Sequence, residues 1–172
     1  MPRRVRLYIA TSLDGYIAGP GDALDWLFTD QDYGYDEFIG QVDAIAMGRR
    51  TYDIVRGFDE WPYEGKHAWV FTRTDGHEPD PRVTFTSASP AAWLVERFTE
   101  GGGDLWLMGG GELARDFLDA HLVDEISVAV HPVILGGGVP LIPPGTHRRT
   151  LRLAHSRAWN SGLVMNTYVV QH

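Results

Sequence analysis

Hydrophobic and polar residues alternate at the start of the chain and in several later stretches. In residues 4–11, Val5, Leu7 and Ile9 lie on one side of an extended chain and polar or aromatic residues lie on the other. This period of two predicts a β-strand. Similar short runs predict further strands over residues 43–47, 67–72, 82–86, 104–108, 124–131, 150–158 and 163–170.

Apolar residues at helical spacing occupy four of the intervals between these strands. Helices are predicted over 31–40, over 50–55, from Ser89 onward and over 113–120. Ser89-Pro90 is typical of a helix start, with serine as the N-cap and proline in the first turn. An apolar stripe on that helix is expected to face the core; it consists of Ala91, Leu94, Val95 and Phe98.

Strands that alternate with helices, followed by consecutive strands at the C-terminus, predict the fold class. We expect an α/β protein of three layers, with a mixed, mostly parallel central sheet and helices on both faces. No linker, repeat or low-complexity segment interrupts the sequence, so residues 1–172 are predicted to form a single domain.

Composition narrows the classes of function. A net charge of −8 disfavours a nucleic-acid partner, because such binding depends on dense Lys and Arg contacts with phosphates. Without cysteine, disulfides and thiolate metal sites are excluded, and the histidines lack ligand spacing, so no metal is expected. No apolar run reaches the length of a membrane span and no signal-like segment opens the chain. We therefore expect a cytoplasmic protein without a membrane partner.

A strand, a glycine and a helix start meet at residues 47–52, Met-Gly-Arg-Arg-Thr-Tyr. Exposed N–H groups at a helix N-terminus favour an anion, and arginine can bind phosphate oxygens in a bidentate manner. Gly48, Arg49, Arg50 and Thr51 are therefore candidate phosphate ligands. The alternative is a solvent-exposed arginine pair after a helix-entry turn.

A second strand-to-helix junction carries consecutive glycines, in residues 108–112, Met-Gly-Gly-Gly-Glu. Glycine lets the backbone approach a ligand where a side chain would clash, as a pyrophosphate site requires. A tight turn is the alternative interpretation. The glycine runs at 101–103 and 136–138 are interpreted as a connector and a loop, and the G-x-G-x-x-G fingerprint does not occur.

A third candidate is the strand end at residues 70–73, Val-Phe-Thr-Arg. Arg73 could contact the 2′-phosphate that distinguishes NADPH from NADH. An arginine at a strand end is also commonly just solvated, and that interpretation stays open.

Five segments occur in the order found in a known superfamily: ATSLDGYIA at 10–18, GRRTY at 48–52, GGG at 109–111, LVDEI at 122–126 and PVILGGG at 132–138. The sequence thereby resembles the dihydrofolate-reductase-like superfamily. Within it, the chain is most similar to the C-terminal reductase domain of the bifunctional riboflavin-biosynthesis deaminase/reductase and to stand-alone bacterial relatives of that domain. The resemblance covers essentially the whole chain and implies an NADPH-dependent reductase, often a homodimer.

The resemblance also implies where NADPH binds. Ala10 and the loop with Leu13 and Gly15 would flank the nicotinamide, and Thr72 and Arg73 would lie near the 2′-phosphate. The full set implied for the phosphates is Gly48, Arg49, Arg50, Thr51, Thr72, Arg73, Met108, Gly109, Gly110, Gly111 and Glu112. A cis bond between two glycines of the run 109–111 is implied as well.

The hydride acceptor depends on the segment after the first strand. Asp25 beside Trp26 is the candidate catalytic proton donor, because a carboxyl group next to tryptophan in a cleft can keep its proton. An exposed or capping aspartate is the alternative. Trp26 and Tyr52 would wall the substrate pocket or belong to the core, and Asp14 is expected to hold the Asp-Gly turn.

At two positions the sequence differs from the related reductases, and these differences narrow the choice of hydride acceptor. Tyr16 stands where riboflavin-pathway reductases typically have lysine, and Lys66 stands where dihydrofolate reductases have a folate-binding arginine. The main hypothesis is an NADPH-dependent oxidoreductase that reduces a small heterocycle, such as a pteridine, a pyrimidine or a related carbonyl or imine compound. The alternative is a catalytically silent NADP(H)-binding module. A homodimer face is expected on strand 124–131 and the C-terminal strand pair.

Overall fold

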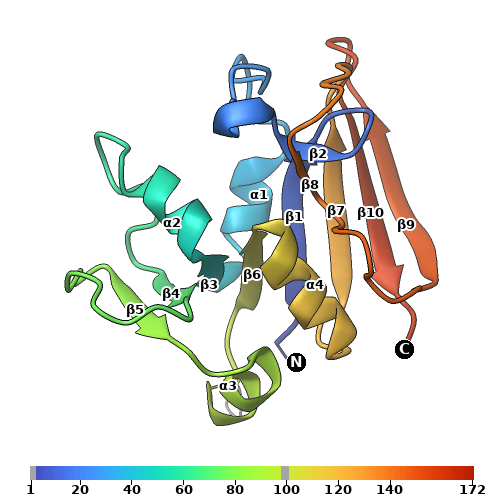
Figure 1. Ribbon diagram of the computed structural model, residues 1–172. Helices are drawn as coiled ribbons and strands as arrows, with labels where there is room; N and C mark the ends of the chain where they lie inside the picture. The colour runs from blue at the N-terminus through green and yellow to red at the C-terminus, as the bar shows by residue number, and fades with distance from the viewer. Residues whose placement is uncertain (1–2, 98–100) are drawn as a thin grey trace.

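Eight strands form one central sheet, in the order β5-β4-β3-β6-β1-β7-β10-β9 (Figure 1). The computed structural model describes residues 3–97 and 101–172. The strands of this sheet are β1 (Val5–Thr11), β3 (Val42–Gly48), β4 (His67–Phe71), β5 (Val83–Thr86), β6 (Asp104–Gly109), β7 (Glu125–Val130), β9 (Leu151–Ala158) and β10 (Val164–Val170). The first six are parallel to one another, whereas β10 is antiparallel to both β7 and β9. The predicted mixed, mostly parallel sheet is therefore confirmed.

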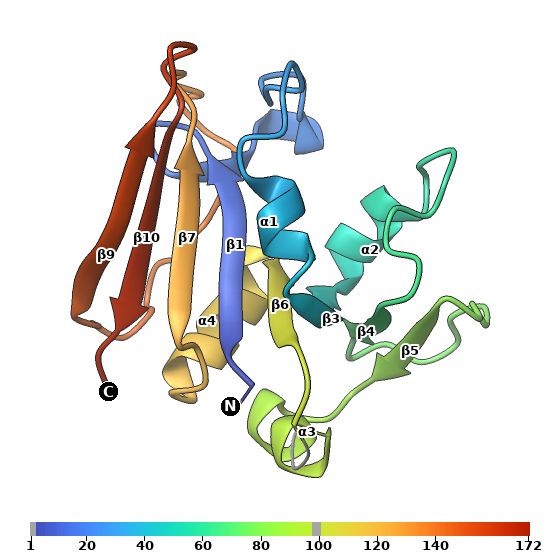
Figure 2. The same ribbon diagram turned by 180° about the vertical axis from the view of Figure 1, so that it is seen from behind.

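Helices cover both faces of the sheet, as the opposite views show (Figure 1 and Figure 2). The helices are α1 (Tyr35–Ile39), α2 (Arg49–Val55), α3 (Pro90–Arg97) and α4 (Gly111–Asp119). Phe38 of α1 and Tyr52 of α2 pack in the core on one face. Trp93 of α3 and Phe117 of α4 pack in the core on the other. Because both faces are covered, the central strands β3 and β6 are apolar and buried on both sides.

The first helix is shorter than the sequence predicts. The expected helix over 31–40 begins only at Tyr35, because Tyr33 and Gly34 have φ values of 56° and 85°, in the left-handed region. The Asp32 carboxylate accepts hydrogen bonds from the N–H groups of Gly34 (2.8 Å) and Asp36 (2.9 Å). These bonds satisfy the turn before the helix instead of extending the helix.

The predicted core stripe of α3 is confirmed at Leu94 and is wrong at Ala91 and Val95. Val95 is 73% exposed and Ala91 is exposed as well, whereas Trp93 is 1% exposed and Leu94 packs beside it. Burying the large indole against the Trp69 ring, with 5.5 Å between centroids, outweighs the stripe of smaller side chains. Phe98, the last member of the stripe, lies outside the described residues. The N-cap is confirmed, since the Ser89 Oγ accepts a hydrogen bond from the Ala92 N–H at 3.3 Å.

A second, two-stranded sheet lies at the carboxyl ends of β1 and β7 and was not predicted. It pairs β2 (Tyr16–Ala18) with β8 (Val139–Pro140), and a 3-10 helix (Pro20–Asp22) follows β2. Gly138 enters β8 with φ 128°, and a Cβ there would lie 2.1 Å from the Ala18 carbonyl oxygen. Glycine is therefore required for this close approach.

The strand β9 forms an open edge of the central sheet. Every residue of β9 is exposed, including Leu151 (39%) and Leu153 (53%). No helix in the described parts of the chain is long and apolar enough to cross a membrane.

Candidate functional site

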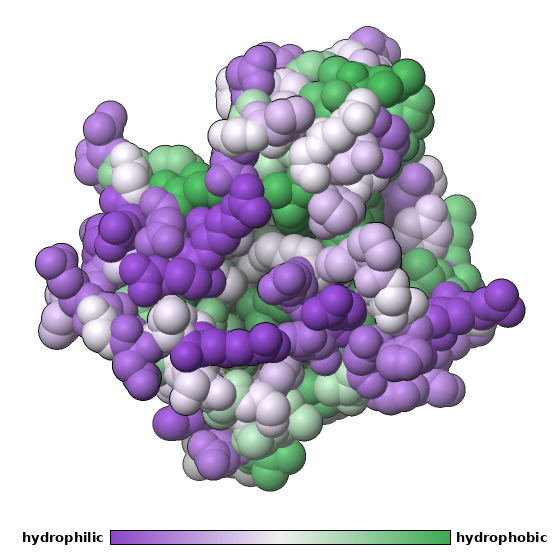
Figure 3. Space-filling view, in the orientation of Figure 1, coloured by the Kyte–Doolittle hydropathy of each residue, from purple (hydrophilic) through white to green (hydrophobic). Residues whose placement is uncertain are grey.

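A cavity of about 950 Å³ lies at the carboxyl ends of β3, β4, β5 and β6. The space-filling view shows hydrophilic side chains around a hollow on this face (Figure 3). In parallel sheets, ligands bind beyond the carboxyl ends of the strands, and the volume is in the range of cofactor sites. The lining residues are Gly48, Arg49, Arg50, Thr51, Phe71, Thr72, Arg73, Thr74, Thr86, Ser87, Ala88, Ser89, Pro90, Gly110, Gly111, Glu112, Leu113, Asp116, Val139, Pro140 and Pro143.

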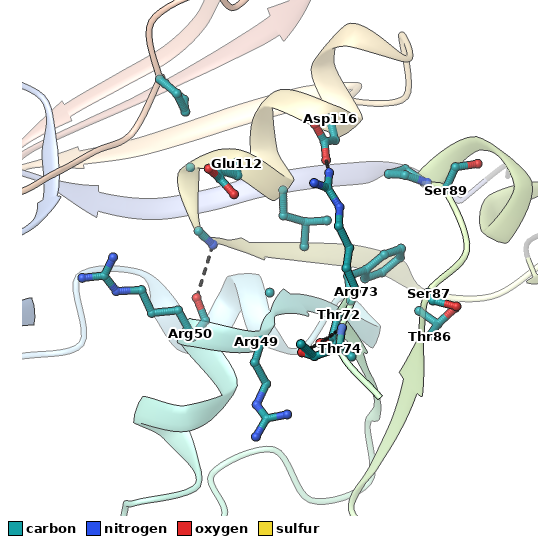
Figure 4. A pocket seen from close by; sticks show the side chains of 18 of the residues that line it. Arg49, Arg50, Thr72, Arg73, Thr74, Thr86, Ser87, Ser89, Glu112 and Asp116 are labelled. Atoms are coloured by element: carbon teal, nitrogen blue, oxygen red, sulfur yellow. Dashed lines mark hydrogen bonds and ion pairs between the residues drawn. The ribbon is translucent and has the colours of Figure 1, made fainter. Parts of the chain in front are cut away.

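The junction of β3 and α2 contributes two arginines to the cavity (Figure 4). The Arg49 Nε lies 3.1 Å from the Asp53 Oδ1, one helical turn away. Arg50 forms an ion pair with Asp22 of the 3-10 helix. Both guanidinium groups are partly solvent-exposed, so an incoming anion can share or displace their carboxylate partners.

The three glycines before α4 have different roles. A Cβ at Gly109 would lie 2.9 Å from the Ile9 Cδ1, and one at Gly111 would lie 2.5 Å from the Pro140 carbonyl oxygen. A Cβ at Gly110 would meet only the Thr51 Oγ1, at 4.0 Å. The peptide bond between Gly109 and Gly110 is cis, as the resemblance implied. Gly111 is thus required for packing and Gly109 for its φ of 113°, whereas Gly110 leaves open space toward the cavity.

The start of α4 presents unpaired N–H groups to the cavity. Its N-cap residue, Gly110, supplies no side chain to cap the first turn, and the Gly110 N–H donates to the Thr51 Oγ1 at 3.2 Å. The exposed Glu112 side chain lines the cavity, but the backbone of the first turn carries the positive end of the helix dipole. An anion at this place would be bound by backbone donors.

The third arginine, Arg73, follows β4, and its side chain extends along the cavity to α4 (Figure 4). The Arg73 side chain is 88% exposed, and its Nη2 lies 3.7 Å from the Asp116 Oδ2. Beside it, the Thr72 and Thr74 hydroxyls are hydrogen-bonded to each other at 2.9 Å. Thr86, Ser87 and Ser89 line the same end of the cavity. This end therefore combines one loosely held cation with a row of hydroxyl groups.

Five residues expected at the cofactor do not line the cavity. Met108 and Gly109 are buried in β6. Ala10 is half-buried in β1, and Leu13 (65% exposed) and Gly15 lie in the loop that follows β1. Because β1 lies next to β6 in the sheet, this second group is adjacent to the cavity beyond the end of β6.

The two residues expected to wall the substrate pocket lie in different surroundings. Tyr52 is 3% exposed in the core, and its hydroxyl donates to the Asp80 Oδ2 at 2.7 Å. Tyr52 thus has the core position that the sequence allowed as an alternative. Trp26 is half-buried in the loop before α1, and its Nε1–H donates to the Ala23 carbonyl oxygen at 3.0 Å.

Asp25 and Asp14 are the acidic residues singled out after β1. Asp25 is exposed and forms no hydrogen bond or ion pair with the described residues. The Asp14 carboxylate accepts bonds from the N–H groups of Leu135 (3.1 Å) and Gly136 (2.8 Å). A hydrogen bond from Ser12, followed by these backbone donors, lowers the pKa of Asp14 to about 2. Asp14 therefore ties its loop to the segment before β8.

Sequence reasoning missed the far wall of the cavity. Thr74, Thr86, Ser87 and Ser89 come from two strand ends that are adjacent only because β5 pairs with β4. The signal was present, since the carboxyl ends of parallel strands share one edge of a sheet and polar residues follow both strands. The segment with Val139, Pro140 and Pro143 also lines the cavity and carries no motif that indicates this position.

These features define a dihydrofolate-reductase-like α/β protein with a nucleotide-sized, partly cationic cavity. The RibD C-terminal domain family matches residues 3–165, and the chain belongs to that family. Bacillus subtilis (strain 168) proteins YwjB and YyaP are similar to it. YwjB is 35% identical over 96% of this chain and 98% of its own length, and YyaP is 33% identical over 96% and 94%.

Solved structures show the same fold. A protein from Shewanella sp. PV-4 ascribed to riboflavin biosynthesis matches with a TM-score of 0.88 and 30% identity, over 98% of this chain and 99% of its own. The diaminohydroxyphosphoribosylaminopyrimidine deaminase/5-amino-6-(5-phosphoribosylamino)uracil reductase from Thermotoga maritima matches with a TM-score of 0.77 and 16% identity, over 99% of this chain and 57% of its own. The chain is thus related to riboflavin-biosynthesis reductases.

Proposed function

We propose that this chain is an NADPH-dependent reductase of a small heterocycle, such as a pteridine, a pyrimidine or a related carbonyl or imine compound. The observation that carries the proposal is the cavity at the strand ends, with three arginines and an uncapped helix start around it. Relatedness to riboflavin-biosynthesis reductases supports the reaction class.

The cavity fits the phosphates of NADPH. Gly48 and Gly110 both line it, and a Cβ at either position would meet no atom closer than 4.0 Å, so the backbone leaves room for a pyrophosphate. Backbone donors of α4, with Arg49 and Arg50, would bind that group. Arg73 and the hydroxyl groups at the other end would bind the 2′-phosphate. The open space at Gly48 and Gly110 and the exposed Arg73 at the other end thus match a ligand that carries a pyrophosphate and a separate phosphate group.

The nicotinamide is proposed to extend past the end of β6 to the end of β1. Ala10, Leu13 and Gly15 lie there, next to the cavity in the order of the sheet. Bound NADPH would supply a hydride from its nicotinamide ring. The chain's part is to bind the two phosphate groups so that the ring is oriented toward the acceptor. Asp25 is the proposed relay of a proton from solvent to the acceptor, since its carboxyl group is exposed and has no partner among the described residues.

The proposed acceptor carries no phosphate. Residues 12–32 contain five aspartates, at 14, 22, 25, 30 and 32, and no lysine or arginine, and residues 131–142 also lack both. Arg50 is paired with Asp22, and the Arg157 guanidinium lies over the Trp159 ring at 4.6 Å. The Thermotoga relative, in contrast, is named for a phosphoribosylamino substrate. An acidic rim favours a neutral or cationic heterocycle.

The experiment is a panel of acceptors incubated with purified protein and NADPH, in which loss of the reduced nicotinamide absorbance is followed. Matched pairs of each heterocycle with and without a phosphate group are included. We expect oxidation of NADPH by an unphosphorylated acceptor, reduced at least tenfold by Asp25→Asn with NADPH binding unchanged. Tight NADPH binding without turnover of any acceptor would instead support the catalytically silent module.

A further inference from the structure

A buried histidine at the end of β7 contacts the loop that carries Asp25 and Trp26. His131 is 3% exposed, and its backbone N–H donates to the Thr11 carbonyl oxygen at 2.7 Å, which holds it beside the end of β1. The imidazole lies between the rings of Trp26 and Phe28, with centroids at 5.2 and 5.0 Å. A polar ring is thus enclosed by apolar side chains of the loop.

Two hydrogen bonds fix the protonation of the ring. The His131 Nδ1 lies 3.0 Å from the Ala129 carbonyl oxygen, which can only accept, so Nδ1 carries the proton. The Phe28 backbone N–H donates to the Nε2 at 3.2 Å, so Nε2 must be unprotonated. The arrangement therefore requires the neutral imidazole in its Nδ1–H form.

Within residues 3–97 and 101–172, the hydrogen bond from Phe28 to His131 is the only one that ties residues 24–28 to the sheet. Among the described residues, the other hydrogen bonds of 24–28 stay within the loop, from the Trp26 Nε1 to Ala23 and from the Leu27 N–H to Leu24. The position of Trp26 therefore depends on ring packing and on the lone pair of His131.

We propose that His131 is a positioning residue that fixes loop 23–28 when it is neutral and releases it when it is protonated. Protonation places an N–H at Nε2 directly opposite the Phe28 N–H, so an attractive contact becomes one between two donors. The consequence for catalysis rests on the proposed function, in which loop 23–28 faces the acceptor. In that case hydride transfer declines at acidic pH because the loop no longer holds the acceptor.

The surroundings of the ring offer the protonated form no partner. The titratable and charged groups on the adjoining elements are Asp25, Asp30 and Tyr33 from the loop side, Tyr8 of β1, Asp14 in the turn after β1, and Arg157 beside Trp159. Asp30 accepts from the Tyr33 hydroxyl at 2.8 Å, and Asp14 is bonded to 135–136. No described carboxylate forms a hydrogen bond or ion pair with the imidazole. A charge on His131 would be neither paired nor hydrated, which favours opening of the loop.

Two substitutions separate the halves of this arrangement. His131→Gln can present an amide oxygen near the Nε2 position and accept from Phe28, but it does not titrate. His131→Asn can donate to Ala129 from near the Nδ1 position but leaves the Phe28 N–H without an acceptor. If the role of His131 were purely structural, both variants would disturb the loop. The two variants would then not differ in how protection of the Phe28 amide depends on pH.

The test is a pH titration of the ligand-free protein by NMR, in which the imidazole nitrogens and the Phe28 amide are followed from neutral pH downward until the ring is protonated or the protein unfolds. We expect the Nδ1–H form at neutral pH and a common midpoint for the ring and the Phe28 amide. Loss of the bond should reduce amide protection about tenfold, or about 1.4 kcal/mol. His131→Gln should keep protection throughout, and His131→Asn should lack it at every pH, while the Phe117 amide stays protected as a control for folding.

An Nε2–H form at neutral pH, a ring that stays neutral until the protein unfolds, or a Phe28 amide that does not change while the ring titrates, would overturn the proposal. In assays with a reduced acceptor, acidification should raise KM for the acceptor and leave the Kd for NADPH unchanged, and His131→Gln should flatten that profile. If the protein reduces no acceptor, the proposed function fails, and the NMR results alone decide whether the histidine controls the loop.

Discussion

Replacing Arg73 by alanine tests whether the cavity distinguishes NADPH from NADH. Arg73 follows β4 and lines the cavity, with its Nη2 3.7 Å from the Asp116 Oδ2. If Arg73 binds the 2′-phosphate, its removal weakens binding of NADPH, which has that group, and leaves NADH unaffected. Because the Arg73 side chain is exposed, Arg73→Ala should fold normally, and a loss of NADPH binding would not reflect a folding defect.

The magnitude follows from the interactions gained and lost. A hydrogen bond to a charged group contributes about 1.5–3 kcal/mol. Binding must also break the pair with Asp116, and an exposed pair of this kind is worth about 0.2–1 kcal/mol. Because the Arg73 side chain is 88% exposed and screened by water, we expect the lower part of the difference. The difference spans about 0.5–2.8 kcal/mol, and its lower part corresponds to about two- to fifteenfold weaker NADPH binding.

Asp116→Asn is the matched counterpart of Arg73→Ala. It removes the competing carboxylate and should tighten NADPH binding by up to about fivefold, the equivalent of one exposed ion pair. Both variants can be compared with the wild type by titration with NADPH and NADH and detection of tryptophan fluorescence. Equal losses for the two nucleotides in Arg73→Ala, or no loss at all, would refute the assignment of the 2′-phosphate.

Three further predictions follow from the geometry. Gly48→Ala places a methyl group in the open space of the cavity, so it should weaken NADPH binding with little change in Tm. Gly111→Ala would place its Cβ 2.5 Å from the Pro140 carbonyl oxygen, so it should lower Tm measurably in thermal unfolding. Because the pKa of Asp14 is lowered to about 2, its stabilising bonds to 135–136 should be fully present above about pH 4 and should weaken as the pH falls through about 2, where half of the carboxyl groups are protonated. Hydrogen exchange at those amides would show this, and protection that is unchanged well below about pH 2 would contradict it. We propose that the open β9 edge forms a homodimer, which Leu153→Lys should convert to a monomer in light scattering; an unchanged mass would argue against that face.

Local signals in the sequence were sufficient for the phosphate end of the site. Strand, glycine and helix start occur within a few residues at 47–52 and at 108–112, so their proximity needs no knowledge of the tertiary structure. Strand identity was also predictable, because strands buried on both faces leave long apolar runs. The start of α1 was not predictable, since the left-handed conformation of Tyr33 belongs to a turn in which the Asp32 carboxylate accepts a hydrogen bond from the Gly34 N–H.

Other parts of the site depend on which strands pair. The hydroxyl wall with Thr86 and Ser87 reaches the cavity only through the β4–β5 pairing, which alternation of residues does not specify. In the sequence, His131 is the last residue of a predicted strand. Its contact with Phe28 joins residues 103 positions apart, which no local pattern indicates. The burial of Trp93 in place of Val95 reflects the size of the space against Trp69, a property of the assembled core.

The central claim is that the cavity at the strand ends binds NADPH, and the most direct measurement is a titration of the wild-type protein with NADPH and NADH, read by quenching of its six tryptophans. We predict saturable binding of NADPH in the micromolar range or tighter, and clearly weaker binding of NADH. An equal and very weak response to both nucleotides would contradict the account and would direct the search toward other ligands of this cavity.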